Sequence, residues 1–507
     1  MTLQDLLARG FFPKEYPPPF STAKFATYAA AGISVSPAPG QKFLLSRPAV
    51  HNLARPGGAR RRLHIPNPFS QFQLCTLLAN NWTDVEKHCA SSPLSVSVPV
   101  ADSSGLRALK ARIDGSELAL SRARVRSAAK FLLRTDIVRF YGSLYTHSVP
   151  WSWQGKAAAK ATRRGGFAND LDTELRNLQD GQTLGIPVGP DTSFVVAEIV
   201  ATAIDRELAQ HRFVGFRFMD DYEFGFSTRV AAEAALAVIE DVLAGYELAV
   251  NPRKTTIDQL PVELDRPWVD EFRTTGLGFL QSSSALIGYF NRAFELKQRF
   301  PNDPVLAYAV ARLRSVNHLG PWPTLTDLLC QCALAEPGTM EPVVTLLQEN
   351  TAKGSAPAID AVIRTALEHH TELSHGSELA WALWAAIWFG RRIPNQLIKR
   401  LDGMTDPAVA LLALHAVGEG LVSGKPTFPR WRSMLTADSL YGPMWLLTYE
   451  ADVKNWLKPS KAGVVKSDPN FGPMRKKRVS FFDKAVKAPT RTLLLGGPPV
   501  GLSVYPD

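Results

Sequence analysis

Hydrophobic and polar positions follow two different patterns along the chain. Between about residues 130 and 285, runs of alternating apolar and polar residues are interleaved with runs of helical spacing, which predicts a mixed layer of strands and helices. After about residue 290, Leu, Ala and Trp recur at helical spacing and the strand pattern fades. This second part is therefore predicted to be helical, with helices near residues 304–315, 323–335, 340–350, 357–370, 377–389, 394–401 and 406–421.

The most apolar of these segments begins near Ser377. Residues 379–388 are apolar on nearly every helical face, so we expect this helix to be buried among other helices. Ser377 is of the residue type that caps helix N-termini. No strict repeat period connects the segments, and the pattern therefore predicts an irregular helical array.

The patterns together predict an α+β fold in several parts. The first eighty residues are expected to be irregular, because the prolines at 17–19 and the Pro-Gly-Gly at 56–58 interrupt helices. The end of the chain is rich in Gly and Pro and carries a basic run at 475–478, which fits a solvated, mobile tail as well as it fits contact with nucleic acid. The predicted parts are an N-terminal segment (1–130), the mixed layer (131–288), the helical array (289–460) and the tail (461–507).

Composition narrows the class of protein. The formal net charge of the 507 residues is +10, which favours a polyanionic partner, nucleic acid before membrane. No run of eighteen apolar residues and no signal-peptide pattern occur, so we expect a cytoplasmic protein without a membrane span. Four cysteines without zinc-type spacing fit a reducing compartment and give no reason to assign them a metal: Cys75, Cys89, Cys330 and Cys332.

Positive charge is concentrated between residues 107 and 139. Nine Lys and Arg stand there against three acidic residues. Such side chains bind phosphates without reading sequence, so we expect this stretch to line a nucleic-acid channel.

An acidic pair lies between two short aromatic runs in residues 213–226. Phe216 and Phe218 share one parity and Phe224 and Phe226 share another, which predicts a β-hairpin with Asp220 and Asp221 at its turn. Adjacent carboxylates repel each other, and a divalent cation with hard oxygen ligands, such as Mg²⁺, offsets that repulsion. About one Asp-Asp pair is expected by chance in a chain of this composition, so a solvated turn is the default explanation for an isolated pair. Only the surrounding segments can favour a metal-binding role.

A third carboxylate, Asp136, follows the apolar run 131–133. A buried Asp requires a partner or a metal, and a salt bridge to a neighbouring Arg is the simpler explanation. Three carboxylates from neighbouring strands can hold two Mg²⁺ about 3.5–4 Å apart, the arrangement that activates a 3′-hydroxyl and neutralises departing pyrophosphate.

Two further segments contain candidate functional residues. The Gly- and Pro-rich loop 181–193 precedes an apolar helix from Phe194 to about Ala209. Asp191, Thr192 or Ser193 could cap this helix, and its first amides could face a nucleotide or template, although an ordinary tight turn also fits. Farther along, a helix at 229–244 and a short strand precede Lys254, which could protonate pyrophosphate or be a surface lysine.

In this order, the segments resemble the palm of a reverse transcriptase. The motifs that carry the resemblance are a metal-binding strand, a loop and helix, an aromatic-x-Asp-Asp hairpin, a lysine motif and a short hydrophobic motif before the thumb: residues 135–141, 185–193, 218–221, 248–254 and 277–279.

A narrower resemblance is to bacterial abortive-infection and defence-associated reverse transcriptases. Residues 9–20, 139–151, 185–193 and 377–384 carry it, and it covers most of the chain. It implies a palm and fingers followed by an all-α helical-repeat domain in place of the thumb. It also implies DNA synthesis from dNTPs during phage infection, RNA-directed or template-independent, with a non-coding RNA as template or scaffold, in a bacterial cytoplasmic trimer or hexamer.

The resemblance also implies roles for single residues. Asp136 and Asp220 would hold two Mg²⁺, with Asp221 as the third carboxylate of the pocket. Tyr141 would be the aromatic gate that excludes a ribose 2′-hydroxyl, although a half-buried palm aromatic also fits. Further nucleotide contacts would come from the fingers and the Gly-rich loop: Arg61 or Arg62, Gly189 and Pro190.

Two departures from the common pattern bear on the activity. Val188 stands where most reverse transcriptases carry Gln in the loop motif, which suits the defence branch and argues against ordinary templated copying. Phe218 replaces the commoner Tyr before the acidic pair. Some family members prime on a protein tyrosine, and spacing does not distinguish a primer from a packed ring among the candidates Tyr16, Tyr28, Tyr441 and Tyr449.

Three hypotheses stay open at this point. The first is a DNA polymerase of the defence type. The second is an RNA-synthesising enzyme or terminal nucleotidyltransferase on the same palm. The third is a non-catalytic assembly protein that binds nucleic acid, against which the retention of three costly carboxylates argues.

Overall fold

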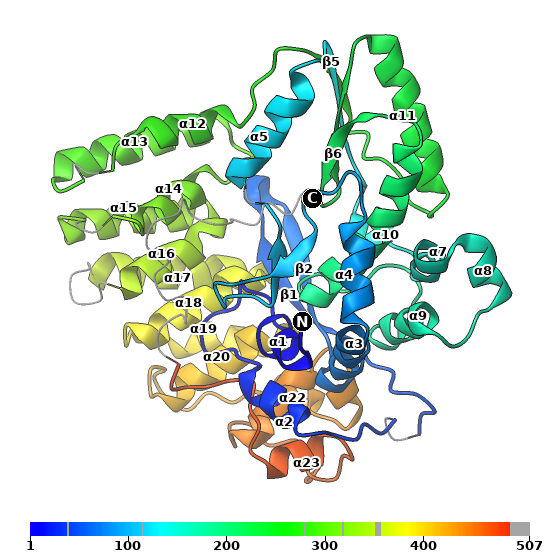
Figure 1. Ribbon diagram of the computed structural model, residues 1–507. Helices are drawn as coiled ribbons and strands as arrows, with labels where there is room; N and C mark the ends of the chain where they lie inside the picture. The colour runs from blue at the N-terminus through cyan, green and yellow to red at the C-terminus, as the bar shows by residue number, and fades with distance from the viewer. Residues whose placement is uncertain (38–39, 114, 278–279, 317–318, 350–355, 487–507) are drawn as a thin grey trace.

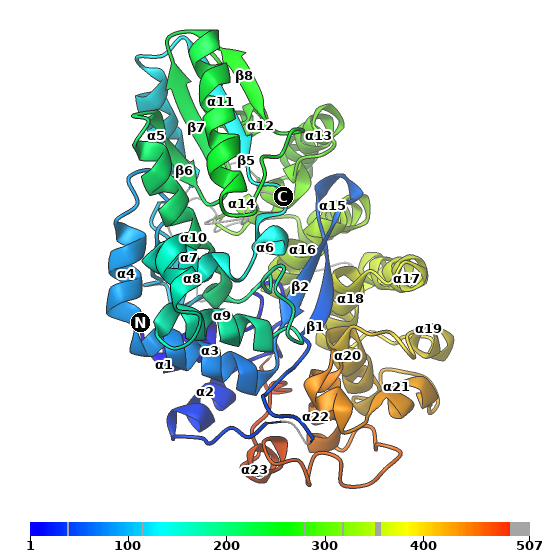
Figure 2. The ribbon, with the colours of Figure 1, turned by 90° about the vertical axis from the view of Figure 1, so that its right-hand side faces the viewer.

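The computed structural model describes residues 1–37, 40–113, 115–277, 280–316, 319–349 and 356–486. Helices and small antiparallel sheets make up this mixed fold (Figures 1 and 2). In Figure 1 a sheet lies toward the upper right, and a stack of helices runs down the left-hand side. No helix among these residues is both long and apolar enough to cross a membrane.

The largest sheet has four antiparallel strands in the order β6-β7-β5-β8. It is formed by β5 (Phe131–Asp136), β6 (Val214–Phe218), β7 (Asp221–Phe226) and β8 (Thr256–Gln259). The aromatic runs of the sequence form the β6–β7 hairpin, as predicted. On one face, α11 (Arg229–Ala244) packs against β5 and β7. On the other face lies α5 (Gly115–Arg126), and a Cβ at Gly225 of β7 would come within 2.8 Å of the Val125 carbonyl oxygen.

Six further helices come before β6 in the sequence, one of them ahead of β5 and five between β5 and β6. The apolar helix predicted from Phe194 begins three residues earlier, as α10 (Asp191–Ala209), and it is buried along most of its length. The others are α4 (Trp82–Ala90), α6 (Phe140–Ser143), α7 (Ser148–Gln154), α8 (Lys156–Ala161) and α9 (Phe167–Asn177).

The first eighty residues are more regular than the prolines suggested. They form α1 (Leu3–Arg9), α2 (Ala23–Ala30), the hairpin of β1 (Ala49–Ala54) and β2 (Arg60–Ile65), and α3 (Pro68–Asn80). The Pro-Gly-Gly segment makes the hairpin turn, with Gly57 at φ +71°, a conformation that glycine adopts readily. A second short hairpin, β3 (Pro99–Ala101) with β4 (Leu109–Ala111), follows.

From residue 267 the regular elements of the described chain are helices, and β-structure is limited to isolated bridges of Ile393 with Val422 and of Phe482 with Phe20. The seven predicted helices occur within a few residues of their expected positions, and Figure 2 shows β1 and β2 standing beside them. The series is α12 (Pro267–Thr274), α13 (Ser283–Arg299), α14 (Val305–Leu313), α15 (Trp322–Ala335), α16 (Met340–Gln348), α17 (Ala356–Glu372), α18 (Gly376–Trp388), α19 (Asn395–Arg400), α20 (Pro407–Gly418), α21 (Pro429–Met434), α22 (Trp445–Val453) and α23 (Phe471–Lys476).

Helix α18 is buried as predicted, but Ser377 is not its N-cap. The helix begins at Gly376, after His375. The Ser377 hydroxyl accepts a hydrogen bond from the Ala54 amide at 2.9 Å and donates one to Glu378 at 2.7 Å. The contact with β1 therefore determines which hydrogen bonds the Ser377 hydroxyl forms.

The predicted boundary of the tail at residue 461 is also corrected. Phe471, Phe481 and Phe482 are buried, and the Phe481 ring packs on Phe11 and Phe25 near the N-terminus. This segment therefore completes the core beneath α1 and α2. The basic run that ends α23 lies at the surface, and residues 487–507 lie outside the described residues.

Candidate active site

Three carboxylates meet at one end of the four-stranded sheet. Asp136 is the last residue of β5, and its partner in the β5–β7 register is Asp221, the first residue of β7. Directly opposed residues on an antiparallel pair project from the same face with Cβ atoms about 5 Å apart. Asp220 immediately precedes Asp221, and its carbonyl oxygen accepts a hydrogen bond from the Ile137 amide at 3.2 Å.

The hairpin turn itself consists of Met219 and Asp220, because Phe218 pairs with Asp221. The prediction that both carboxylates lie at the turn is thus correct for Asp220, whereas Asp221 starts the strand. Met219 has φ +56°, a left-handed conformation that costs about 1–3 kcal/mol for a residue other than glycine. Two hydrogen bonds hold it: its amide donates to Ser97 Oγ and its carbonyl accepts from Arg217 Nη1, both at 2.6 Å.

Burial and mutual repulsion disfavour the charged forms of Asp220 and Asp221. The side chains of Asp136 and Asp220 are almost fully buried, with residue exposures of 1% and 3%. Burial, then the charge of Asp221, raises the pKa of Asp220 well above its usual value. Burial, then the charge of Asp136, raises the pKa of Asp221 to about 7. Clustered oxygen ligands whose charges repel each other are the donor set that suits a hard divalent cation.

Lys254 supplies the nearest positive charge. Its Nζ atom lies 2.9 Å from Asp136 Oδ2. The chain reaches this position because Val250 bridges Ile137 and the Asn251 amide donates to the Asp136 carbonyl oxygen at 2.8 Å. In this arrangement the Lys254 ammonium balances the charge of the carboxylates. To protonate a leaving group, it would have to leave Asp136 and bind a phosphate instead.

A small pocket of about 40 Å³ gathers most of the predicted nucleotide-binding residues. Tyr141, Arg61, Gly189 and Pro190 line it together. Arg62 is not among its lining residues and is exposed, because successive residues of β2 point to opposite faces. The volume has room for a few water molecules.

The Gly-rich loop is fixed against β2 by hydrogen bonds between His64 and Val188. The His64 amide donates to the Val188 carbonyl at 2.7 Å, and the Val188 amide donates to His64 Nδ1 at 3.1 Å. Gly189 has φ +130°, and a Cβ there would lie 3.3 Å from Pro13. The positive φ therefore favours glycine, and any side chain here would also require Pro13 to shift by a few tenths of an ångström.

The predicted helix cap after this loop is corrected. Pro190 occupies the N-cap position of α10, and no side chain caps the helix. Asp191 instead accepts hydrogen bonds from the amides of Ala108 and Leu109 at 3.1 and 3.0 Å, and it pairs with Arg107. Burial raises the pKa of Asp191, and Arg107 opposes that shift.

The basic stretch 107–139 is divided between internal pairing and the surface. Four of its nine cations pair with buried or partly buried acids: Arg107 with Asp191, Arg122 and Arg126 with Glu223, and Arg134 with Asp258. The expectation that the whole stretch lines a channel is therefore too broad. The cations at the surface are Lys110, Arg112, Arg124, Lys130 and Arg139.

A buried ionic cluster behind the hairpin was not predicted. Arg217 of β6 donates to Glu198 at 2.9 Å and to Asp205 at 2.7 Å, both on α10. All three side chains are at most 2% exposed. The signal in the sequence was the spacing of Glu198 and Asp205, seven residues apart on one face of an apolar helix. Since Arg217 also holds the Met219 carbonyl, this cluster supports the turn that carries Asp220.

The short hydrophobic motif predicted before the thumb is described only at Leu277. Its other two residues, Gly278 and Phe279, lie outside the described residues.

Comparison with known proteins gives distant likenesses only. No family model matches the chain, and no curated protein matches it. Among solved structures, a truncated apo telomerase from Candida tropicalis has a TM-score of 0.30 at 11% identity, over 47% of this chain and 54% of that one. Telomerase from Candida albicans with a telomeric RNA fragment has a TM-score of 0.32 at 10% identity, over 76% and 68%. A further apo telomerase from Candida tropicalis has a TM-score of 0.29 at 11% identity, over 78% and 71%.

The chain thus spans about half of the first of these structures. All three TM-scores are below 0.5, too low for an argument about fold or function. The function is therefore inferred from the site itself.

Proposed function

We propose that this chain is a Mg²⁺-dependent nucleotidyltransferase of the reverse-transcriptase type that adds dNMP units to a DNA end. The observation that carries the proposal is the convergence of Asp136, Asp220 and Asp221 at one end of the sheet. These residues would hold the two Mg²⁺, which would lower the pKa of the attacking hydroxyl and neutralise the departing pyrophosphate.

The protein's own groups would orient the reactants. Ser97 and Arg217 fix the turn, so Asp220 is presented without reorganisation during the reaction. Arg61 would bind triphosphate oxygens through its planar guanidinium. The main-chain groups of Gly189 and Pro190 would form the floor beneath the nucleotide, beside the Tyr141 ring. Release of Lys254 from Asp136 would place its ammonium next to pyrophosphate.

The proposal is tested by supplying single labelled dNTPs with Mg²⁺ to the purified protein and resolving the products on a denaturing gel. Incorporation that requires Mg²⁺ supports it. Product mobility that changes after protease treatment would indicate protein priming, and loss of product after RNase pretreatment would indicate an RNA template or scaffold. Absence of incorporation with every dNTP, with RNA and DNA ends supplied, would contradict the proposal.

Sugar selection is expected to depend on the Tyr141 ring, which lines the pocket between Arg61 and the Gly-rich loop. Tyr141→Ala should raise ribonucleotide incorporation relative to deoxyribonucleotide incorporation by about tenfold or more, since steric exclusion of one small group is worth about 1–3 kcal/mol. The ratio of kcat/KM for a dNTP and its matching NTP measures this. An unchanged ratio would favour the second hypothesis, an RNA-synthesising or terminal transferase activity.

Mg²⁺ binding should strengthen as the pH rises through about 7, because burial and Asp136 raise the pKa of Asp221 to that value. The folded, metal-free protein binds a proton at Asp221 over a range where the unfolded chain does not, so this group makes the metal-free fold less stable as pH rises. The increase in Tm caused by Mg²⁺ should therefore be larger at about pH 8 than at about pH 6. Asp221→Asn should weaken this pH dependence, and the remainder would come from Asp220, whose pKa is also raised by burial; an equal Mg²⁺ effect at both pH values in the unmodified protein would contradict the prediction.

Among the candidate primers, burial separates one tyrosine from the rest. Tyr16, Tyr441 and Tyr449 are at most 7% exposed, and the Tyr449 hydroxyl donates to the Val479 carbonyl at 2.7 Å. Tyr28 is partly exposed, so it is the member of this set that fits a priming role.

The wider role follows from the sequence resemblance alone. We propose DNA synthesis in anti-phage defence in a bacterial cytoplasm, by a homo-oligomer, with nucleic acid bound through the exposed cations of residues 110–139. Loss of phage protection together with loss of nucleotide incorporation in one variant would link the two; protection without incorporation would favour the non-catalytic hypothesis.

A further inference from the structure

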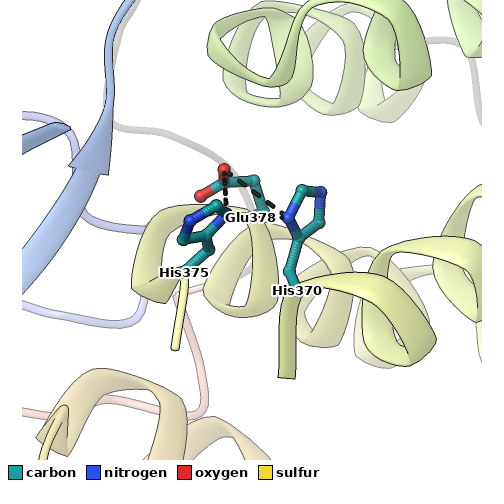
Figure 3. A group of neighbouring side chains, drawn as sticks. All are labelled: His370, His375 and Glu378. Carbon is teal, nitrogen blue, oxygen red and sulfur yellow. Dashed lines mark hydrogen bonds and ion pairs between the residues drawn. The ribbon is translucent and has the colours of Figure 1, made fainter. Parts of the chain in front are cut away.

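A second cluster of potential metal ligands lies in the helical array, away from the three carboxylates. His370 lies in the last turn of α17, His375 precedes α18, and Glu378 lies in the first turn of α18 (Figure 3). Ser374 between them has φ +52°, and this left-handed residue reverses the chain so that the two imidazoles face each other. One ligand atom from each of the three residues lies within 4.8 Å of the other two.

The ligand atoms are spaced as in a tetrahedral metal site. His370 Nδ1 lies 3.0 Å from His375 Nδ1, and Glu378 Oε1 lies 3.5 Å from His375 Nδ1 and 3.8 Å from His370 Nδ1. Ligands held about 2.0–2.1 Å from Zn²⁺ in a tetrahedron are about 3.3 Å apart. Small side-chain rotations would therefore bring all three atoms onto one ion, as Figure 3 illustrates by their convergence.

The carboxylate of Glu378 is oriented for this role by neighbours on β2 and α18. Its Oε2 atom accepts from Arg60 Nη2 at 2.9 Å and from Ser377 Oγ at 2.7 Å, whereas Oε1 accepts from Arg60 Nη1 at 2.5 Å. Because each carboxylate oxygen offers about two acceptor positions, Oε1 keeps one, on the atom nearest the imidazoles. Groups that fix a ligand in this way are typical of metal sites.

We propose that His370, His375 and Glu378 form a Zn²⁺ site with water in the fourth position. Two imidazoles and one carboxylate suit Zn²⁺ and not Mg²⁺ or Ca²⁺, which require mainly oxygen ligands in larger number. The His370 and His375 side chains are 14% and 23% exposed, so an ion and a water molecule can reach them. The guanidinium of Arg60 repels a cation, and its pairing with Glu378 therefore sets the affinity below that of a site without it.

The site would join the helical array to the hairpin that carries the predicted nucleotide contact. Arg60 and Arg61 are consecutive on β2, the first bound to Glu378 and the second lining the pocket beside Tyr141. The Asn52 side chain on β1 also donates to the Ser374 carbonyl at 3.1 Å. A bound ion would stiffen this junction. The proposal does not depend on the polymerase function.

Co²⁺ titration of the purified full chain tests the site, because tetrahedral Co²⁺ absorbs visible light far more strongly than the six-coordinate ion expected on clustered carboxylates. We expect an intense band that saturates at one equivalent and disappears when Zn²⁺ is added. His370→Gln and His375→Gln should each abolish the band. His369→Gln, at an exposed neighbour on the same helix, should retain it and is the matched control.

Circular dichroism of each variant verifies that the fold is retained, and each of the two ligand variants is sufficient if the other misfolds. Absence of an intense band in the folded, unmodified protein, or its persistence in a folded ligand variant, would overturn the proposal and leave the contact between Nδ1 atoms as a hydrogen bond between imidazoles. Neither result bears on nucleotide incorporation.

Discussion

Asn in place of Asp220 should reduce nucleotide incorporation at least about a thousandfold, a loss of about 4 kcal/mol of transition-state stabilisation. The amide has nearly the shape of the carboxylate but cannot balance the charge of a divalent cation. Asp136→Asn should have an effect of the same order, because Asp136 lies opposite Asp221 in the strand register. Single-nucleotide incorporation measured at saturating Mg²⁺ and dNTP gives the change in kcat.

The same substitution should not destabilise the protein. Burial and the neighbouring Asp221 charge already raise the pKa of Asp220, so its charged form opposes folding in the absence of metal. Asp220→Asn removes that cost, and its Tm without Mg²⁺ should equal or exceed that of the unmodified protein. Lost activity with retained or increased Tm separates a chemical role from a structural one.

Asp258→Asn is the matched control for these variants. Asp258 lies on β8 of the same sheet and pairs with Arg134 at 2.6 Å, but both side chains are partly exposed, so the change should cost no more than about 1 kcal/mol. Activity within a few-fold of the unmodified protein is expected. Equal activity losses for Asp220→Asn and Asp258→Asn would contradict the assignment of the site.

For the double change Asp220→Ala with Asp221→Ala, we also expect phage protection to disappear.

Arg217→Met should produce the largest loss of stability, about 3–5 kcal/mol. The arginine is fully buried and is bound to two buried carboxylates, Glu198 and Asp205. Burial raises the pKa of Asp205, and Arg217 opposes that shift. Without the guanidinium, two acidic side chains would remain buried with no countercharge. Thermal and urea unfolding measure the loss in the free energy of unfolding. Hydrogen exchange follows the opening of the region around the sheet.

Two comparisons make the Arg217 prediction specific. Combining Arg217→Met with Glu198→Gln and Asp205→Asn removes both uncompensated charges and should recover a large part of the stability. Arg229→Met breaks an exposed pair with Glu233, whose side chains are 61% and 52% exposed, and should cost less than about 0.5 kcal/mol. A loss below about 1 kcal/mol for Arg217→Met would mean that the cluster contributes little to the fold.

Incorporation should also fall in the Arg217 variants that remain folded. Arg217 Nη1 donates to the carbonyl of Met219, the left-handed residue that places Asp220. In the triple variant the charges are balanced but this hydrogen bond is absent. A recovered Tm with reduced kcat would therefore identify positioning of the turn as a separate function of Arg217.

Patterns local in the sequence were enough to predict the helices from α14 to α20 and the β6–β7 hairpin. Helical spacing located the series from α14 to α20 because each of these helices buries a face or the whole of its surface. Equal parity of the aromatic residues located β6 and β7 because alternate residues of a strand share a face. The order of the acidic, Gly-rich and lysine segments predicted a single site; the structure places Asp136 beside Asp221 and Lys254, and it places Gly189 and Pro190 in a pocket with Arg61 and Tyr141.

Contacts between distant segments were decided only in three dimensions. Local rules favoured Ser377 and Asp191 as helix caps, yet each forms hydrogen bonds with a strand or loop far away in the sequence. Arg107 and Arg134 counted equally as surface charge in the sequence, yet Arg107 pairs with a buried Asp and Arg134 with a half-exposed one. The sequence pattern placed Phe481 in a mobile tail, whereas in the structure its ring packs against Phe11 in the core.

The sequence by itself determined the helices from α14 to α20, the β6–β7 hairpin and the types of residue available for chemistry, because periodicity and propensity act over a few neighbouring residues. The tertiary structure alone decided which charges are neutralised, which caps are used and which of Arg61 and Arg62 lines the pocket. Burial and electrostatic pairing depend on distances between separate segments of the chain, and no local pattern encodes those distances.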